Sequence, residues 1–138
     1  MIETDTLTSA HIHALLADNG FETEDTAPGV FAIRQPDSGL TIHAVVEGQV
    51  IFFSLTCLTV PDGKLTPQVL RLMLQADNGI STSHFQLYAM GEGQTAVALS
   101  NFAKLQELGP DDEDDILSCL NFLLADLSVA KRLLEQLA

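Results

Sequence analysis

Residues 50–60 read Val-Ile-Phe-Phe-Ser-Leu-Thr-Cys-Leu-Thr-Val, and this stretch constrains how the rest of the chain can fold. In a β-strand, alternate side chains share a face. One face would carry Ile51, Phe53, Leu55 and Cys57, and the other Phe52, Ser54, Thr56 and Leu58. The first set is wholly apolar and the second is mixed. Because an edge strand this apolar would invite aggregation, we expect residues 50–60 to form the central, most buried strand of a sheet.

Two hairpins complete the predicted sheet. Before the central strand, apolar and β-branched residues fill 30–33 and 40–46, on either side of the turn sequence Pro36-Asp37-Ser38-Gly39. After it, residues 84–89 alternate in polarity and residues 96–99 are all apolar, on either side of Gly91-Glu92-Gly93. These segments predict a five-stranded antiparallel sheet. Residues 22–29 are polar and acidic and close with Pro28-Gly29, which predicts a connecting loop.

Two shorter helices are predicted on either side of the first three strands. The first follows residue 7, with Thr8 or Ser9 as its N-cap and Gly20 as its stop. The second begins at Thr66-Pro67 and ends at Gly79. Its body is apolar nearly all round, through Val69, Leu70, Leu72, Met73, Leu74 and Ala76. Such a helix should be buried on two sides, so something must cover the second side.

A third helix, of about 27 residues and ~40 Å, is predicted at the end of the chain. Its apolar stripe advances in steps of four and three, through Ile116, Leu120, Leu123, Leu127, Ala130, Leu134 and Leu137. The acidic run Asp111 to Asp115 precedes the stripe, where carboxylates favour the positive end of the helix dipole. The order helix, three strands, helix, two strands, helix predicts an α+β fold, and 138 residues fit a single domain over 1–138.

Composition excludes several classes of partner. The chain carries 19 acidic and 6 basic residues, a net charge of −13, so we expect neither nucleic acid nor an anionic membrane as partner. Its 46% hydrophobic content is too high for a disordered acidic chain. The start Met-Ile-Glu-Thr-Asp lacks the features of an export signal, and two cysteines make no disulfide scaffold. We therefore expect a cytoplasmic protein.

No motif predicts catalysis, a metal or a cofactor. His11 and His13 are two residues apart, so on a helix their rings would point about 200° apart and could not share one ion. The run Asp111 to Asp115 lacks the spacing of a calcium loop, and Gly91-Glu92-Gly93 lacks the third glycine of a nucleotide loop. Cys57 and Cys119 lie among apolar residues and are expected to be buried and unreactive. We expect a protein that is not an enzyme.

The residue patterns resemble a known family over nearly the whole chain. They are residues 50–55, the leucine-rich helix over 70–78 that ends near Asn78, the strand over 94–99, and the amphipathic last helix. In this order they resemble the class I type III secretion chaperones (the Tir-chaperone, or CesT-like, family) and the related YbjN-like proteins. Residues 83–87 stand in the place of the family's Gly-x-x-Leu strand and lack its glycine.

The resemblance implies a bacterial homodimer that holds the unfolded amino-terminal segment of a client protein. A twofold partner would also cover the second side of the doubly apolar helix. We expect the dimer interface at Val69, Leu70, Met73 and Leu74. Client binding would use apolar pockets and main-chain pairing at a sheet edge, and we expect Ile12, Leu16, Phe31 and Ile33 to contribute.

Two other functions stay open on the sequence. One is a YbjN-like cytoplasmic regulatory or stress-associated domain that binds a folded partner. The other is a small ligand-binding protein or hydrolase with a site around His43, His84 and Tyr88. The second would require these three side chains to line a pocket together.

Overall fold

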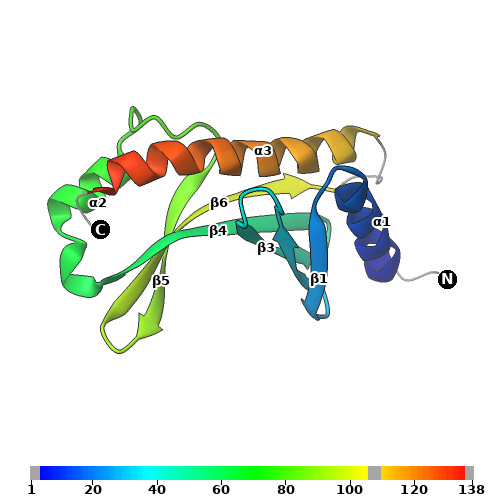
Figure 1. The fold of residues 1–138 in the computed structure, drawn as a ribbon, viewed down its shortest axis with the longest axis horizontal. Coiled ribbons are helices and arrows are strands. Elements are labelled where there is room, and N and C mark those ends of the chain that lie inside the picture. The colour runs from blue at the N-terminus through cyan, green and yellow to red at the C-terminus, as the bar shows by residue number, and fades with distance from the viewer. Residues whose placement is uncertain (1–3, 106–109, 136–138) are drawn as a thin grey trace. The chain divides into compact units, whose positions relative to one another are not determined.

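The computed structural model describes residues 4–105 and 110–135 and has an α+β fold (Figure 1). Its elements are α1 (Thr4–Asp18), β1 (Glu22–Ala27), β2 (Val30–Arg34), β3 (Thr41–Glu47), β4 (Val50–Pro61), a 3₁₀ turn (Asp62–Lys64), α2 (Pro67–Leu74), β5 (His84–Gly91), β6 (Gln94–Lys104) and α3 (Pro110–Leu133). The strands form one sheet in the order β1-β2-β3-β4-β6-β5. β4 is therefore an interior strand, as its apolar sequence predicts.

The sheet has six strands, so the prediction of five is wrong. The extra strand is β1, in the acidic stretch expected to be a loop, and it pairs antiparallel with β2. Its side chains are exposed except for half-buried Thr23. Because β1 buries almost no side chain, its sequence shows no apolar alternation. Charged residues on an edge strand also discourage pairing with other chains. Arg34 on β2 donates to Glu22 on β1 at 3.1 Å.

The second helix is shorter than predicted, because α2 ends at Leu74 rather than near Gly79. Thr66 caps its start as expected, with Oγ1 accepting a hydrogen bond from the Val69 N–H at 3.3 Å. At its end Gln75 is extended, and the Asn78 side chain donates to the Met73 carbonyl at 2.6 Å. This side-chain bond replaces the continuation of the helix.

The other two helices also differ in their bounds. α1 begins at Thr4, before the expected caps Thr8 and Ser9, and stops where Gly20 takes a φ of +86°. α3 has 24 residues and opens with Asp111, Asp112 and Glu113 in its first turn, as predicted. Leu137 of the predicted stripe lies outside the described residues.

The chain divides into two compact units. Unit 1 comprises Met1–Ser54 and Phe102–Leu120, and unit 2 comprises Leu55–Asn101 and Asn121–Ala138. The long elements β4, β6 and α3 contribute residues to both units.

In unit 1 the buried apolar side chains come from α1 and from one face of the strands, together with the start of α3. They are Ile12, Leu16, Phe31, Ile33, Ile42, Ala44, Ile51, Phe53, Ala103, Leu105, Ile116 and Leu120. Strand pairing places Val30 opposite Val45 and Val45 opposite Phe52, on the face away from this core.

Unit 2 has its own core, to which α2, β4, β6 and the end of α3 contribute. Val60, Val69, Met73, Val97 and Leu134 form its buried cluster. Cys57, Leu58, Leu65, Leu70 and Phe85 pack against that cluster and are partly buried. The α2 helix is thus fixed to unit 2 by one of its faces.

Candidate protein-binding surfaces

Helix α2 turns one apolar face into unit 2 and leaves the other on the surface. Val69 and Met73 are 7% and 4% exposed and belong to the core of their own unit. Leu70 is partly buried, whereas Leu74 is 79% exposed. Of the four residues predicted for a dimer interface, the structure therefore leaves Leu70 and Leu74 accessible to a second chain.

Leu70 and Leu74 line a shallow groove on the outer side of α2. Its volume is about 370 Å³, and its lining is Pro67, Leu70, Arg71, Leu74 and Gln75. Arg71 is the one charged residue in this lining. Exposed apolar surface of this kind on a folded protein often marks a site where a partner binds.

The four residues predicted to hold a client are buried instead. Ile12, Leu16, Phe31 and Ile33 are each at most 1% exposed and form part of the core of unit 1. A partner would reach them only after unit 1 opened. Apolar spacing identified them as important for packing but did not separate a core position from a binding position.

The β5 edge of the sheet is apolar and exposed, in contrast to the acidic β1 edge. In unit 2, β5 pairs antiparallel with β6 from His84 to Gly91. Among its side chains, Leu87, Tyr88 and Met90 are 44%, 43% and 60% exposed. The strand carries no Asp, Glu, Lys or Arg. Such an edge presents unpaired backbone groups and apolar side chains to an extended peptide.

Unit 1 has a second exposed apolar surface, on the sheet face away from its core. Phe52 on β4 and Phe102 on β6 are 42% and 59% exposed. Their ring centroids lie 6.1 Å apart with the planes tilted by 44°, an ordinary geometry for an interacting aromatic pair. Sequence reasoning placed Phe52 on the mixed face of its strand but did not identify the pair, because Phe102 is 50 positions away.

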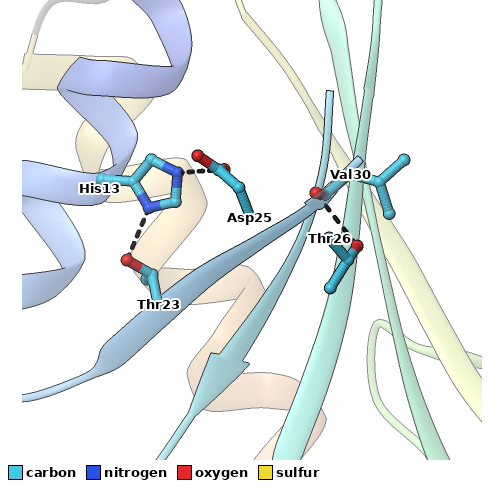
Figure 2. Close-up of polar contacts among 5 residues, drawn as sticks. All are labelled: His13, Thr23, Asp25, Thr26 and Val30. Atoms are coloured by element: carbon cyan, nitrogen blue, oxygen red, sulfur yellow. Dashed lines mark hydrogen bonds and ion pairs between the residues drawn. The ribbon is translucent and has the colours of Figure 1, made fainter. Parts of the chain in front are cut away.

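The histidines of α1 hold that helix to neighbouring elements, and Figure 2 shows the contacts of His13. Nε2 of His13 donates to Asp25 Oδ1 at 2.8 Å, and Nδ1 lies 2.6 Å from the Thr23 hydroxyl. His11 lies 2.9 Å from Glu113 at the start of α3. The two rings thus have separate partners. Among the described residues, no group of three or more His, Cys, Asp or Glu could hold a metal ion.

Figure 2 also shows a hydrogen bond that links edge strand β1 to β2. The Thr26 hydroxyl donates to the Val30 carbonyl across the turn between β1 and β2 at 3.2 Å. Together with the two bonds of His13, this contact gives the acidic strand polar partners in place of the apolar packing it lacks.

The residues of the predicted ligand site do not surround the α2 groove. His43 is exposed on β3 in unit 1, and His84 and Tyr88 are exposed on β5 in unit 2. The Tyr88 hydroxyl donates to Gln86 Oε1 on its own strand at 2.5 Å. Gly91, Glu92 and Gly93, all with positive φ, form the turn between β5 and β6, as predicted. No observation on the described residues favours a hydrolase.

The thiols of Cys57 and Cys119 are half-buried and have raised pKa values. Burial raises the pKa of the Cys57 thiol from about 9 to about 11, against the opposing effects of a backbone hydrogen bond from Leu99 and the charge of Lys131. Burial also raises the pKa of Cys119 to about 11, helped by the nearby Asp115 carboxylate. Neither environment resembles that of a reactive cysteine.

These pKa values predict slow thiol chemistry. A rise of two pKa units lowers the thiolate fraction at pH 8 about a hundredfold, so native alkylation by iodoacetamide should be about a hundredfold slower than in urea. Raising the pH toward 11 should close this gap. Mass spectrometry of each cysteine peptide over time measures both rates, and native rates equal to those in urea would contradict the assignment.

A buried carboxylate in unit 2 was missed by the sequence-based prediction. Asp126 on α3 is 3% exposed and accepts hydrogen bonds from the Ser81 N–H at 2.9 Å and the Ser83 N–H at 3.4 Å. The Ser81 hydroxyl also donates to this carboxylate, at 2.9 and 3.0 Å from its two oxygens. One signal was present, because Asp126 falls between Leu123 and Ala130 on the buried stripe of the last helix.

Comparison with known proteins gives a fold but no close relative. No protein-family model matches the sequence, and a search of curated proteins found no match. The structure is similar to YbjN from E. coli, a proposed transcription regulator, with a TM-score of 0.61 and 15% identity over 88% of both chains. It is also similar to a chain of the heterodimeric ExoU–SpcU complex of the Pseudomonas aeruginosa type III secretion system, with a TM-score of 0.56 and 25% identity. That match covers 91% of this chain and 97% of the other.

The expected resemblance is confirmed. The chain has the fold of the type III secretion chaperone-like superfamily, which includes YbjN-like proteins. In the part of the chain that the structure describes, no helix combines the length and hydrophobicity needed to cross a membrane.

Proposed function

We propose that this chain, which has the type III secretion chaperone-like fold, is a non-enzymatic, homodimeric protein-binding module that holds an extended segment of a client protein. One observation carries the proposal: β5 is an uncharged edge strand with three exposed large side chains, Leu87, Tyr88 and Met90. A client strand that pairs with this edge satisfies its backbone groups and covers those side chains. The structure is similar to a chain of the heterodimeric ExoU–SpcU complex of a secretion system, and that chain binds another protein. This similarity supports a protein partner here.

The test is to compare baits that differ at the edge strand. Wild-type protein should recover a client from lysate of its own cells, and Leu87→Lys should not, because a lysine on an edge strand opposes pairing. Gln68→Lys is the matched control, since it adds the same charge at an exposed position of α2 and should leave recovery unchanged.

Hydrogen exchange then locates the bound segment. On addition of a synthetic peptide that spans the recovered segment, the amides of residues 84–91 should exchange more slowly, and those of β1 should not change. Protection that misses β5 would rule out pairing at this edge. Recovery of a folded partner without an extended segment would favour the YbjN-like regulatory function instead.

We further propose that two copies meet through the outer side of α2, at Leu70 and Leu74. The groove lies in unit 2, which has five acidic and four basic residues and a net charge of −1. Unit 1 has 14 acidic and two basic residues, a net charge of −12. Two copies that meet through unit 2 therefore avoid placing strongly like-charged surfaces against each other.

The dimer can be tested by light scattering after size exclusion. Wild type at tens of micromolar should show twice the mass of one chain, and Leu74→Glu should show the mass of one chain. Because Leu74 is 79% exposed, the substitution should not disturb the fold. Gln68→Glu places the same charge on the same helix outside the groove and should remain dimeric. A monomeric wild type would exclude this part of the proposal.

A further inference from the structure

An apolar row crosses four neighbouring strands of unit 1. Val30 on β2 pairs with Val45 on β3, and Val45 pairs with Phe52 on β4. The Phe52 ring contacts Phe102 on β6, the next strand of the sheet. The two valines are half-buried and the two aromatic rings are about half-exposed. We call these four residues the aromatic row.

The aromatic row lies on the face of the sheet that the core of unit 1 does not use. Phe31, Ala44 and Phe53 are the sequence neighbours of row residues and are all buried, so alternation sends the row to the other face. On that face Glu47 follows Val45 by two residues, and Glu24 pairs with Ala32, two residues beyond Val30. The row is therefore apolar at its centre and acidic at its margins.

The basic residues of unit 1 do little to offset this charge. They are Arg34, whose guanidinium is 3.1 Å from the Glu22 carboxylate, and Lys104, two residues after Phe102 on the same face of β6. Against them stand 14 acidic residues, so unit 1 holds nearly all of the chain's net charge of −13.

We infer that the aromatic row binds a cationic, amphipathic segment of a partner protein, with the segment's apolar side chains on the row and its lysines or arginines toward the acidic margins. This inference rests on the proposed function as a protein-binding module and adds the chemistry of the bound segment. A second copy of this chain does not fit, since it would bring another unit of net charge −12. Anionic membranes and nucleic acids are repelled by the same charge.

Model peptides separate the apolar from the electrostatic part of this binding. The probes are fluorescein-labelled 16-residue peptides of alternating Lys and Leu, alternating Lys and Ser, and alternating Glu and Leu, titrated with wild-type protein by fluorescence anisotropy. We expect the Lys–Leu peptide to bind at least tenfold more tightly than either of the others. Its affinity should fall several-fold between 50 and 200 mM salt, because screening weakens exposed charge interactions.

Variants of the protein locate the site. Phe102→Ser should weaken Lys–Leu binding about tenfold, as expected for a central aromatic contact, and Phe102→Leu should retain most of it. Phe122→Ser removes a comparably exposed aromatic ring from α3 and should change affinity less than twofold. Circular dichroism melting checks that each variant is folded.

Three results would overturn the inference. Equal binding of the Lys–Ser peptide would mean that charge alone attracts the probe, and equal binding of the Glu–Leu peptide would mean that charge plays no part. Unchanged affinity in folded Phe102→Ser would place the site elsewhere. None of these depends on client recovery at β5, which is tested separately with Leu87→Lys, so failure of one proposal is distinguishable from failure of the other.

Discussion

Replacing Phe53 with alanine should lower the free energy of unfolding by about 3–5 kcal/mol, whereas replacing its neighbour Phe52 should cost less than about 1 kcal/mol. Phe53 is 1% exposed in the core of unit 1, and its loss would leave a cavity among packed side chains. Phe52 points to the other face and is 42% exposed. Urea denaturation followed by far-ultraviolet circular dichroism measures both values.

The comparison of Phe52 with Phe53 is sharp because the two residues share chemistry, size and strand. Any difference in stability must come from the face to which each points. Similar losses for Phe52→Ala and Phe53→Ala would mean that both faces of β4 are covered in solution. That result would also remove the aromatic row as a free surface.

The central strand is the part of the fold that the sequence predicts best. Residues 50–60 alternate strongly enough to fix which face is buried, and the structure buries Ile51, Phe53 and Leu55. Hairpins were also predictable, since turn residues separate their strands on both sides of α2. The signal is local in each case, and no distant partner is needed to interpret it.

Edge strand β1 was missed because its stability does not come from its own residues. Glu, Thr, Glu, Asp, Thr and Ala offer no apolar face, and the strand exists because β2 lies beside it and α1 supplies His13. The end of α2 was missed for a related reason. The Asn78 side chain competes with the helix for the Met73 carbonyl, and helical periodicity alone does not record that competition.

The candidate binding residues show a different limit. Spacing identifies apolar positions but does not distinguish a side chain packed in its own core from one that awaits a partner. Met73 and Leu74 are adjacent on α2 and equally apolar, yet one is 4% and the other 79% exposed. The surfaces that remain, at Leu74, on β5 and along the aromatic row, could be found only after the chain's own packing was known.

The net charge is distributed unequally between the two units. Over the sequence, a charge of −13 indicates only a generally acidic protein. Assigned to the two units, it leaves unit 2 close to neutral and unit 1 at −12. The proposed surface between copies and the proposed surface for a cationic segment thus fall in different electrostatic surroundings, and salt should affect the two kinds of binding differently.

Asp126→Ala should lower the free energy of unfolding by about 2–3 kcal/mol. Asp126 is more than 40 positions away in sequence from Ser81 and Ser83, which it binds. Its buried carboxylate accepts from both the backbone and the hydroxyl of Ser81 and from the backbone of Ser83, just before β5 begins. Alanine would leave the Ser83 N–H without this acceptor in a buried place. The amide introduced by Asp126→Asn would keep one acceptor oxygen, so this variant should lose about half as much stability.

Asp77→Ala is the matched control for this prediction, because Asp77 is an exposed acid in the same connection between α2 and β5. It should change stability by less than about 0.5 kcal/mol in the same urea experiment. Equal losses for the two variants would show that the Asp126 carboxylate does not hold the connection.

If Asp126 does fix the start of β5, hydrogen exchange over residues 84–91 should quicken in Asp126→Asn even under conditions where the rest of the chain stays folded. Client binding at β5 should then weaken without any change to the exposed side chains of the edge itself, because a strand must be ordered before another strand can pair with it.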